Sequence, residues 1–358
     1  MTPRIRVGYV PYSADLSAPG DRRRFAYYAR HRDLDFEVHR PGQRYDLVVL
    51  SARADLSTWR RAPRDGTKIV FDLIDSYLAT PRDTTHARLR GLAKFAAREL
   101  RRPVLDYHGV IEDMCQRADA VVCSTPEQRA GISSLNPNVH VILDIHAEEV
   151  TSVKSDFAIG PIVHLVWEGL PYTLDDFDAV APTLQSIDAD QPLALHLVTD
   201  LHYGRLVGRH LRAETAKLIR GILPRTYLYQ WSEHLLGPIV TACDIAIVPL
   251  DVKDPLARAK PENKLLLLWR FGMPVLTSAT PAYDRVAGEA SVELTCKDPA
   301  EWDRKLRAMI ADQGLREHSA HAGRRYLADH HDPAQSLARW DALLESLSMV
   351  APRSSNRR

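Results

Sequence analysis

The sequence predicts an α/β protein built from two doubly wound, Rossmann-like domains that face a cleft, with helices near the C-terminus. Short apolar runs rich in β-branched residues alternate with longer amphipathic runs, which is typical of strand–helix–strand units and parallel sheets. A polar stretch from about 144 to 160 interrupts the alternation, which then begins again. We therefore expect an N-terminal domain over 1–150, a C-terminal domain with terminal helices over 151–348 and a disordered tail over 349–358.

The strands of the first domain are expected where mostly apolar runs are long enough to be buried in a sheet. These runs lie at 5–10, 34–38, 45–50, 68–73, 118–124 and 139–143. Amphipathic runs predict helices between several of them, at about 21–30, 85–100 and 106–117.

The second domain repeats the pattern and ends in helices. Strands are expected at 161–169, 193–200, 226–231, 243–250, 273–279 and 291–295, and helices at about 174–187, 209–220, 233–242, 262–271 and 281–287. After 297 the apolar residues recur at helical spacing in three further segments. Asp298 and Asp332 each precede a proline, which is a typical pair of residues at a helix start.

Composition excludes several classes of protein. The 358 residues carry 47 Lys and Arg against 46 Asp and Glu, so the chain is no bulk polycation for nucleic acid. No run approaches the length of about 18 apolar residues that a membrane span needs. The N-terminal apolar stretch is too short for a signal peptide, so we expect a cytoplasmic protein. The four cysteines form no Cys-x-x-Cys pair, and neither a disulfide framework nor a metal site is predicted.

Charge is distributed unevenly along the chain. Residues 1–110 contain 21 Lys and Arg against 13 Asp and Glu. Such an excess fits attraction to an anionic membrane surface or an acidic glycan, and arginines on solvated helix faces explain it as well. Peripheral association with the inner face of a membrane is therefore one of two interpretations.

The segment 257–276, "ARAKPENKLLLLWRFGMPVL", combines a polar cluster with the start of an apolar helix. Pro261 is suited to a first helical turn, where free backbone N–H groups and the helix dipole attract anions. Lys260 and Lys264 would add two charges to a phosphate site there. The alternative is that both lysines lie in solvent and Glu262 only stabilises the helix start.

Four segments in the same order resemble GT-B glycosyltransferases, especially relatives of glycosyltransferase family four. They are "ADAVVCSTPEQRAGISSLNPNVHVILD", "IVHLVWEGLPYTLDDFDAVAPTL", "YLYQWSEHLLGPIVTACDIAIVPL" and "KPENKLLLLWRFGMPVLTSATPAY", which together span about 118–296. The resemblance implies transfer of a sugar from a nucleotide-sugar donor, which is a substrate and not a cofactor, to a glycan or lipid-linked acceptor. It also implies a retaining reaction without a metal ion.

The resemblance assigns the donor to the second domain. Lys260 and Lys264, helped by Asn263, are expected to stabilise the phosphate that leaves, and Glu262 is expected to accept hydrogen bonds from donor hydroxyls.

Three further residues complete the expected donor site. Trp231 and Ser232 are placed beside the nucleobase, although Trp231 is equally suited to a core. Gly169 would let the donor approach the backbone closely, and the alternative is a plain turn.

The first domain is expected to hold the acceptor near Gly8 and Ser13. Asp72 and Asp75 lie at the end of a predicted strand, where a carboxylate can orient or deprotonate a hydroxyl, while Asp75 is also a plausible helix cap.

The chain departs from the family in two respects. The Arg and Lys that relatives have near the first strand of the C-terminal domain have no match in "VWEGLPYTLDD". Relatives often have two glutamates eight positions apart, and the matching positions here are Ala259 and Leu267. Two alternatives to a glycosyltransferase therefore stay open: a binding or scaffold protein that keeps the fold without activity, and a sugar-nucleotide epimerase or phosphorylase-like enzyme.

Overall fold

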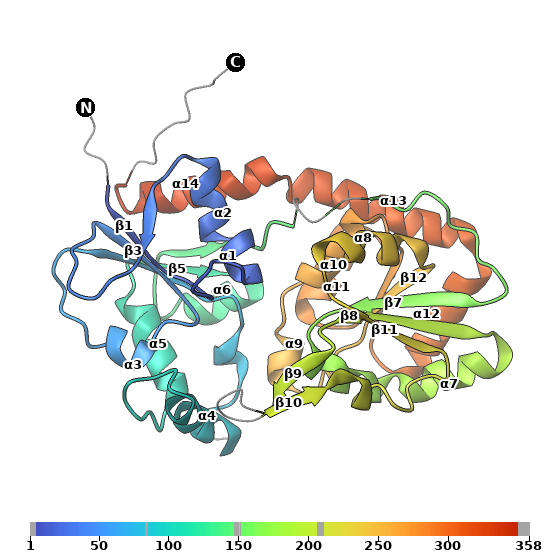
Figure 1. The fold of residues 1–358 in the computed structure, drawn as a ribbon. Helices are drawn as coiled ribbons and strands as arrows, with labels where there is room; N and C mark the ends of the chain where they lie inside the picture. The colour runs from blue at the N-terminus through green and yellow to red at the C-terminus, as the bar shows by residue number, and fades with distance from the viewer. Residues whose placement is uncertain (1–4, 83–84, 147–149, 151, 206–210, 350–358) are drawn as a thin grey trace. The chain divides into compact units, whose positions relative to one another are not determined.

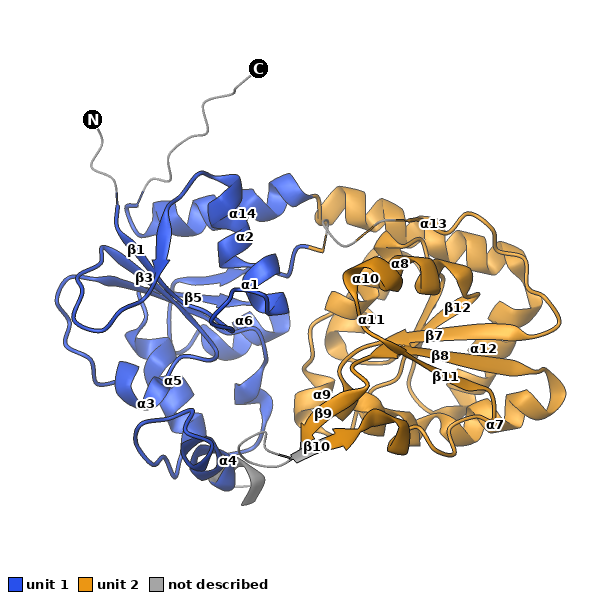
Figure 2. Ribbon diagram, in the orientation of Figure 1, with its two compact units in different colours: residues 1–145, 333–358 blue, residues 146–332 orange. Residues whose placement is uncertain are grey.

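A computed structural model describes residues 5–82, 85–146, 150, 152–205 and 211–349 (Figure 1). The described chain divides into two compact units, residues 1–145 with 333–358 (unit 1) and residues 146–332 (unit 2), coloured separately in Figure 2. Each unit contains one six-stranded parallel sheet, and the predicted fold class is confirmed. The expected disordered tail lies outside the described residues, apart from Met349.

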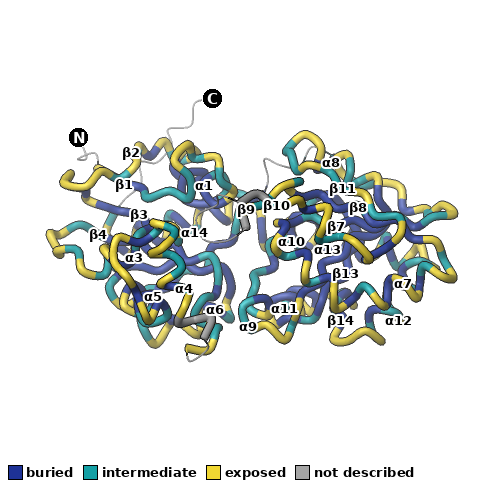
Figure 3. Tube along the Cα trace, turned by 60° about the horizontal axis from the view of Figure 1, so that its bottom comes forward, coloured by how far each residue is buried: buried dark blue, intermediate teal, exposed yellow. Residues whose placement is uncertain are grey.

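The sheet of unit 1 has the strand order β2-β1-β3-β4-β5-β6, and neighbouring strands run parallel. Its strands are β1 (Val7–Val10), β2 (Phe36–Val38), β3 (Leu47–Ser51), β4 (Lys68–Asp72), β5 (Ala120–Cys123) and β6 (Val139–Val141). The central strands β3 and β5 are buried at every position, because helices cover both faces of a parallel sheet. Figure 3 shows β3 in dark blue.

The helices of unit 1 include two that the sequence pattern did not predict, α3 and α6. They are α1 (Pro19–Arg23), α2 (Phe25–His31), α3 (Leu56–Trp59), a 3-10 turn η1 (Tyr77–Ala79), α4 (Thr85–Ala96), α5 (Tyr107–Arg117), α6 (Pro126–Ile132) and the last helix, α14 (Pro333–Ser346). Both missed helices are short, and each begins at a side-chain cap, Asp55 for α3 and Thr125 for α6. The helix expected over 21–30 is interrupted at Arg24, whose φ of −124° and ψ of −122° are not helical.

The sheet of unit 2 has the order β11-β8-β7-β12-β13-β14, again parallel throughout. Its strands are β7 (Val163–Glu168), β8 (Leu193–Thr199), β11 (Thr226–Gln230), β12 (Ile245–Val248), β13 (Val275–Ser278) and β14 (Thr295–Cys296). The order reverses at β7, since β8 and β12 lie on either side of it.

The helical elements of unit 2 follow the predicted positions except in one segment and in the short helix α9, which the sequence pattern did not predict. They are η3 (Pro171–Ala179), α7 (Ala181–Asp190), η4 (Thr215–Lys217), α8 (Glu233–Ala242), α9 (Pro255–Arg258), α10 (Asn263–Arg270), α11 (Pro281–Glu289), α12 (Pro299–Ala311) and α13 (Gln313–His330). The helix predicted over about 209–220 is wrong. The described part of that segment forms β10 (Leu211–Glu214), which pairs antiparallel with β9 (His202–Arg205), and then η4.

Helix α14 follows α13 along the chain but belongs to unit 1. Trp340 stacks on Tyr28 of α2 with ring centroids 5.7 Å apart, and Arg32 forms an ion pair of 2.7 Å with Asp341. These contacts place residues 333–346 with the first domain, whereas the sequence assigned them to the second. That assignment followed from adjacency along the chain. In the structure the helix packs on the aromatic surface of α2 instead.

Among the described residues, no helix is both long enough and apolar enough to span a membrane. The four cysteines are free and buried, and burial raises the pKa of each thiol to about 12. They therefore contribute to the cores as small apolar side chains.

Packing of α13 on α10 depends on Gly323. A Cβ on Gly323 would overlap the buried ring of Trp269, so only glycine allows this approach. We expect Gly323→Ala to lower the free energy of unfolding by about 1 to 3 kcal/mol in chemical denaturation. The matched control is Gly131→Ala in α6, where a Cβ meets nothing within 4 Å and a small gain in stability is expected. Equal effects of the two substitutions would contradict this account of the packing.

Candidate functional site

Polar side chains gather in unit 2 where the adjacent strands β7 and β12 end. In an open parallel sheet, ligands bind beyond the carboxyl ends of the strands, at the point where the strand order reverses. Here β7 is followed by Gly169 and η3, and β12 is followed by a loop that leads through α9 to α10. The predicted residues Lys260, Glu262, Asn263 and Lys264 lie at the end of this loop and the start of α10.

Lys264 is the second residue of α10 and lies over an aromatic ring. Its Nζ is 4.6 Å from the ring centroid of Trp167, the fifth residue of β7. Burial lowers the pKa of the Lys264 ammonium to about 8, and Glu168 acts in the opposite direction. The charged form is therefore poorly solvated in this position.

The charge of Lys264 is not neutralised by an ion pair within the described residues. Nearby carboxylates form their ion pairs elsewhere: Asp176 with Lys260 at 3.4 Å, and Glu262 with Arg285 at 2.8 Å. A cation with a lowered pKa, held against an aromatic face at the start of a helix, is suited to accept an anion from solution.

Gly169 makes room for the lysine itself. A Cβ at this position would overlap both the Lys264 Nζ and the Trp167 ring. The sequence suggested that Gly169 lets a donor approach the backbone, and the structure shows that the amine of Lys264 already occupies the space above it.

Asn263 presents a second unsatisfied group beside Lys264. Its Oδ1 is buried, and no described residue donates a hydrogen bond to it. Glu262 is 1% exposed, and its contact with Arg285 links the start of α10 to α11. The carboxylate of Glu262 is thus held by the protein, although the prediction gives it donor hydroxyls to bind.

Trp231 and Ser232 follow β11, which is separated from β7 by β8. The Ser232 Oγ accepts a hydrogen bond from the Leu235 N–H at 3.2 Å and so caps α8. Trp231 is half-buried, and its backbone N–H donates to the Thr199 carbonyl at 2.9 Å. These residues have structural partners, and their predicted place beside a nucleobase stays a prediction.

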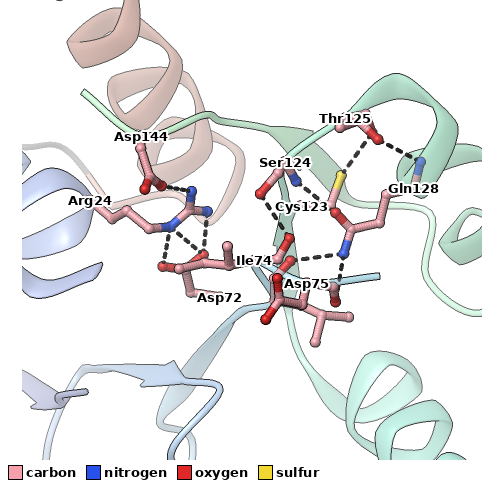
Figure 4. A network of polar contacts seen from close by, with 10 residues as sticks. Arg24, Asp72, Ile74, Asp75, Cys123, Ser124, Thr125, Gln128 and Asp144 are labelled. Carbon is pink, nitrogen blue, oxygen red and sulfur yellow. Dashed lines mark hydrogen bonds and ion pairs between the residues drawn. The ribbon is translucent and has the colours of Figure 1, made fainter. Parts of the chain in front are cut away.

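In unit 1, Asp72 belongs to a buried ion-pair network (Figure 4). The Arg24 guanidinium donates to both Asp72 oxygens at 2.5 to 3.0 Å and to Asp144 at 2.9 Å. Arg24 and Asp72 are fully buried. Burial raises the pKa of Asp72, and Arg24 acts against that rise. A carboxylate bound on both oxygens by arginine is poorly suited to take a proton from a hydroxyl.

Asp75 is more accessible than Asp72 and lies in the loop after β4. It is half-buried, and its Oδ2 accepts a hydrogen bond from the Tyr77 hydroxyl at 3.0 Å. The Gln128 amide, at the start of α6, donates to the carbonyls of Leu73 and Asp75 and fixes this loop (Figure 4). Of the two predicted carboxylates, Asp72 is therefore bound within the fold, whereas Asp75 is the more accessible one.

Gly8 and Ser13 do not form a common site. Gly8 lies within β1, and the ring of Tyr45 packs against it so closely that a Cβ would lie 3.0 Å from the ring. The Ser13 hydroxyl donates to Asp21, which also accepts from the Tyr9 hydroxyl and the backbone N–H of Tyr12. Ser13 therefore stabilises the loop after β1.

Unit 1 also contains a cavity of about 750 Å³ that includes none of the predicted site residues. Its lining combines Val10, Val48 and Trp59 with the arginines Arg64 and Arg117. The described residues contain no group of three or more His, Cys, Asp or Glu side chains that could hold a metal ion.

The GT-B fold consists of two doubly wound units such as these, each with a parallel sheet. The predicted resemblance to GT-B glycosyltransferases is confirmed at the level of the fold. The finer likeness to family four stays a prediction. No protein-family model matches the sequence, and no curated protein matches it.

Several solved structures are similar. HepE from Anabaena, in complex with UDP-glucose, has a TM-score of 0.61 at 12% identity, covering 96% of this chain and 99% of that one. Sucrose-phosphate synthase from Thermosynechococcus elongatus has a TM-score of 0.58 at 15% identity, covering 85% and 74%. TarM from S. aureus has a TM-score of 0.57 at 10% identity over 83% of this chain, which spans only 55% of the TarM chain.

Sequence reasoning missed the residues that surround Lys264. Trp167 and Glu168 were assigned only to a strand, and Asp176 only to a helix, although "WEG" and "LDDFD" stand in segments that carry the resemblance. The missing signal is spatial, because pairing of β7 with β12 brings Trp167 beside a helix about 100 positions later in the chain.

Asp72 and Asp75 lead to opposite predictions for stability. Asp72→Asn leaves the buried Arg24 guanidinium without its main counter-charge and should lower the free energy of unfolding by about 3 to 5 kcal/mol. Asp75→Asn should change it by less than about 0.5 kcal/mol. Urea denaturation of both variants measures the difference, and a stable Asp72→Asn protein would show that the pair does not support the fold.

Proposed function

We propose that the chain is a glycosyltransferase that moves a sugar from a nucleotide-sugar donor to a glycan or lipid-linked acceptor. The observation that carries this proposal is the Lys264 ammonium, which lies against Trp167 without an ion-pair partner among the described residues. The unsatisfied Oδ1 of Asn263 lies one residue before it. Both belong to the first turn of α10, where helix N–H groups have no partner within the helix.

The chemistry of sugar transfer fits such a site. When the bond between the sugar and the diphosphate breaks, negative charge develops on the phosphate that leaves. A cation and a helix N-terminus that are already in place stabilise this charge without reorganisation. Lys264 is proposed to contact the phosphate, and Lys260 to support it from the ion pair with Asp176.

The nucleotide class is supported by the neighbours in fold. HepE is similar over nearly its whole length and holds UDP-glucose, so uridine diphosphate is the first probe to use. The acceptor is assigned to unit 1, with Asp75 as the carboxylate available to orient a hydroxyl. Retention of configuration, independence of metal ions and peripheral membrane association belong to the same proposal.

The first test compares Lys264→Met with Lys253→Met, an exposed lysine in the loop before α9. Uridine and guanosine diphosphates are screened by thermal shift at increasing concentration. The nucleotide that raises the Tm of the wild type should have to be at least tenfold more concentrated to raise the Tm of Lys264→Met equally. Lys253→Met should respond like the wild type. Transfer or hydrolysis of the matching nucleotide-sugars, followed by mass spectrometry with and without EDTA, gives the activity. Binding without any turnover would instead support the non-catalytic alternative.

Lys264 should also lower the free energy of unfolding when no ligand is bound. Its pKa in the folded protein is about 8, below the usual value near 10.5, so the protonated form disfavours folding. The cost is fully present below pH 8 and disappears as the pH rises towards 10.5. At pH 7, Lys264→Met should therefore unfold with a free energy higher by about 3 kcal/mol at most, and the difference should shrink above pH 8 and vanish only above about pH 10.5.

Nucleotide affinity should fall as Lys264 loses its proton. Between pH 7 and 9.5 the diphosphate stays ionised while Lys264 loses its proton, so the Kd should rise by about tenfold per pH unit above 8. Calorimetry over this range measures the effect. A Kd that rises equally in Lys264→Met would assign the titration to another group.

A further inference from the structure

Helix α4 exposes its apolar side chains instead of burying them. Leu89, Leu92 and Phe95 are 55%, 36% and 41% exposed. They are spaced by three residues and therefore form one stripe along the helix. Leu105, in the segment that follows, is 72% exposed.

The opposite side of α4 is held by polar and small residues. The Arg90 guanidinium lies 4.0 Å from the ring centroid of Tyr77, and Lys94 lies over Tyr107 at 5.5 Å and pairs with Glu99 at 2.7 Å. Gly91 approaches so closely that a Cβ would overlap the Val104 carbonyl oxygen. The helix is thus anchored to unit 1 through its cations and its glycine, which leaves the apolar stripe uncovered.

Arginines follow the stripe directly. Arg98, with a φ of 59°, ends the helix, and Arg101 and Arg102 come next along the chain. All three are exposed. The nearby carboxylates bind other cations, Glu99 with Lys94 and Asp106 with Arg82, so these positive charges are not offset within the described segment.

We propose, as a refinement that rests on the peripheral membrane association of the proposed function, that α4 and the segment after it dock unit 1 onto an anionic lipid bilayer. Leu89, Leu92 and Phe95 enter the boundary between headgroups and acyl chains, and Arg98, Arg101 and Arg102 bind lipid phosphates. An amphipathic helix with an apolar face and basic flanks binds such interfaces through burial of its apolar side chains and through attraction to anionic headgroups. A bilayer satisfies the apolar stripe and the positive charges together, which an uncharged protein partner does not.

The experiment is flotation of the full chain with vesicles of phosphatidylcholine alone or with about 30 mol% phosphatidylglycerol. The wild type should bind the anionic vesicles and be released as salt rises from about 0.1 to 0.5 M. The double variant L92Q/F95Q should lower the partition coefficient at least tenfold, and R98Q/R101Q/R102Q should do the same for anionic vesicles only.

Matched controls separate this surface from general effects. Val38→Gln removes another exposed apolar side chain of unit 1, and R304Q/R324Q/R325Q removes the same charge from α12 and α13. Both should bind vesicles like the wild type. The α4 variants should keep the wild-type thermal midpoint and the nucleotide response of unit 2, because the changed side chains are exposed and belong to unit 1.

Three results would overturn the proposal. One is a wild-type protein that does not float with anionic vesicles at low salt. Another is equal loss of binding in the control variants. The third is a wild-type dimer in sedimentation that L92Q/F95Q dissociates without any change in vesicle binding, which would assign the stripe to a second copy of the chain.

Discussion

Desolvation of a cation near the carboxyl ends of parallel strands is the constraint on which this structure depends, and the two units meet it in opposite ways. Unit 1 surrounds Arg24 with two carboxylates, one at the end of β4 and one shortly after β6. Unit 2 places Lys264 beside β7 and directs the neighbouring carboxylates to other partners. A buried charge is tolerated when it is paired, and an unpaired one lowers stability unless a ligand completes it.

The difference explains why unit 2 holds the more persuasive ligand site. Glu168 and Asp176 both favour the charged form of Lys264, yet Asp176 contacts Lys260 and the backbone N–H of Asp251. The protein therefore keeps a destabilising charge at a position where the helix start favours anions. Such local conflicts within an otherwise consistent fold are expected at functional sites.

Most of the fold could be predicted from the sequence because buried parallel strands are continuous apolar runs. Ten of the twelve expected strands contain an observed strand entirely. The other two, 45–50 and 291–295, each end one residue before the observed strands β3 and β14 do. The hairpin of β9 and β10 was missed because it replaces a crossover helix without a strong apolar pattern. Helix α14 was assigned to the wrong unit because sequence order does not reveal that Trp340 packs on Tyr28.

The candidate site was predictable in its position and not in its contacts. Lysines before an apolar helix and a glycine after a strand are visible in the sequence, so Lys264 and Gly169 were both chosen. Their relation was not visible: Gly169 is small because the Lys264 ammonium lies where its side chain would be. The same limit applies to Asp72, whose place at a strand end suggested chemistry before Arg24 was seen to bind both of its oxygens.

Helix α4 shows most clearly what a sequence pattern alone cannot predict. Its apolar residues recur at helical spacing, and that pattern alone predicts a face turned towards the core. The structure reverses this expectation because Gly91, Arg90 and Lys94 provide a tight, aromatic-lined attachment on the other side. A periodic pattern identifies a helix and its stripe, but only the packing partners decide whether the stripe faces the protein or its surroundings.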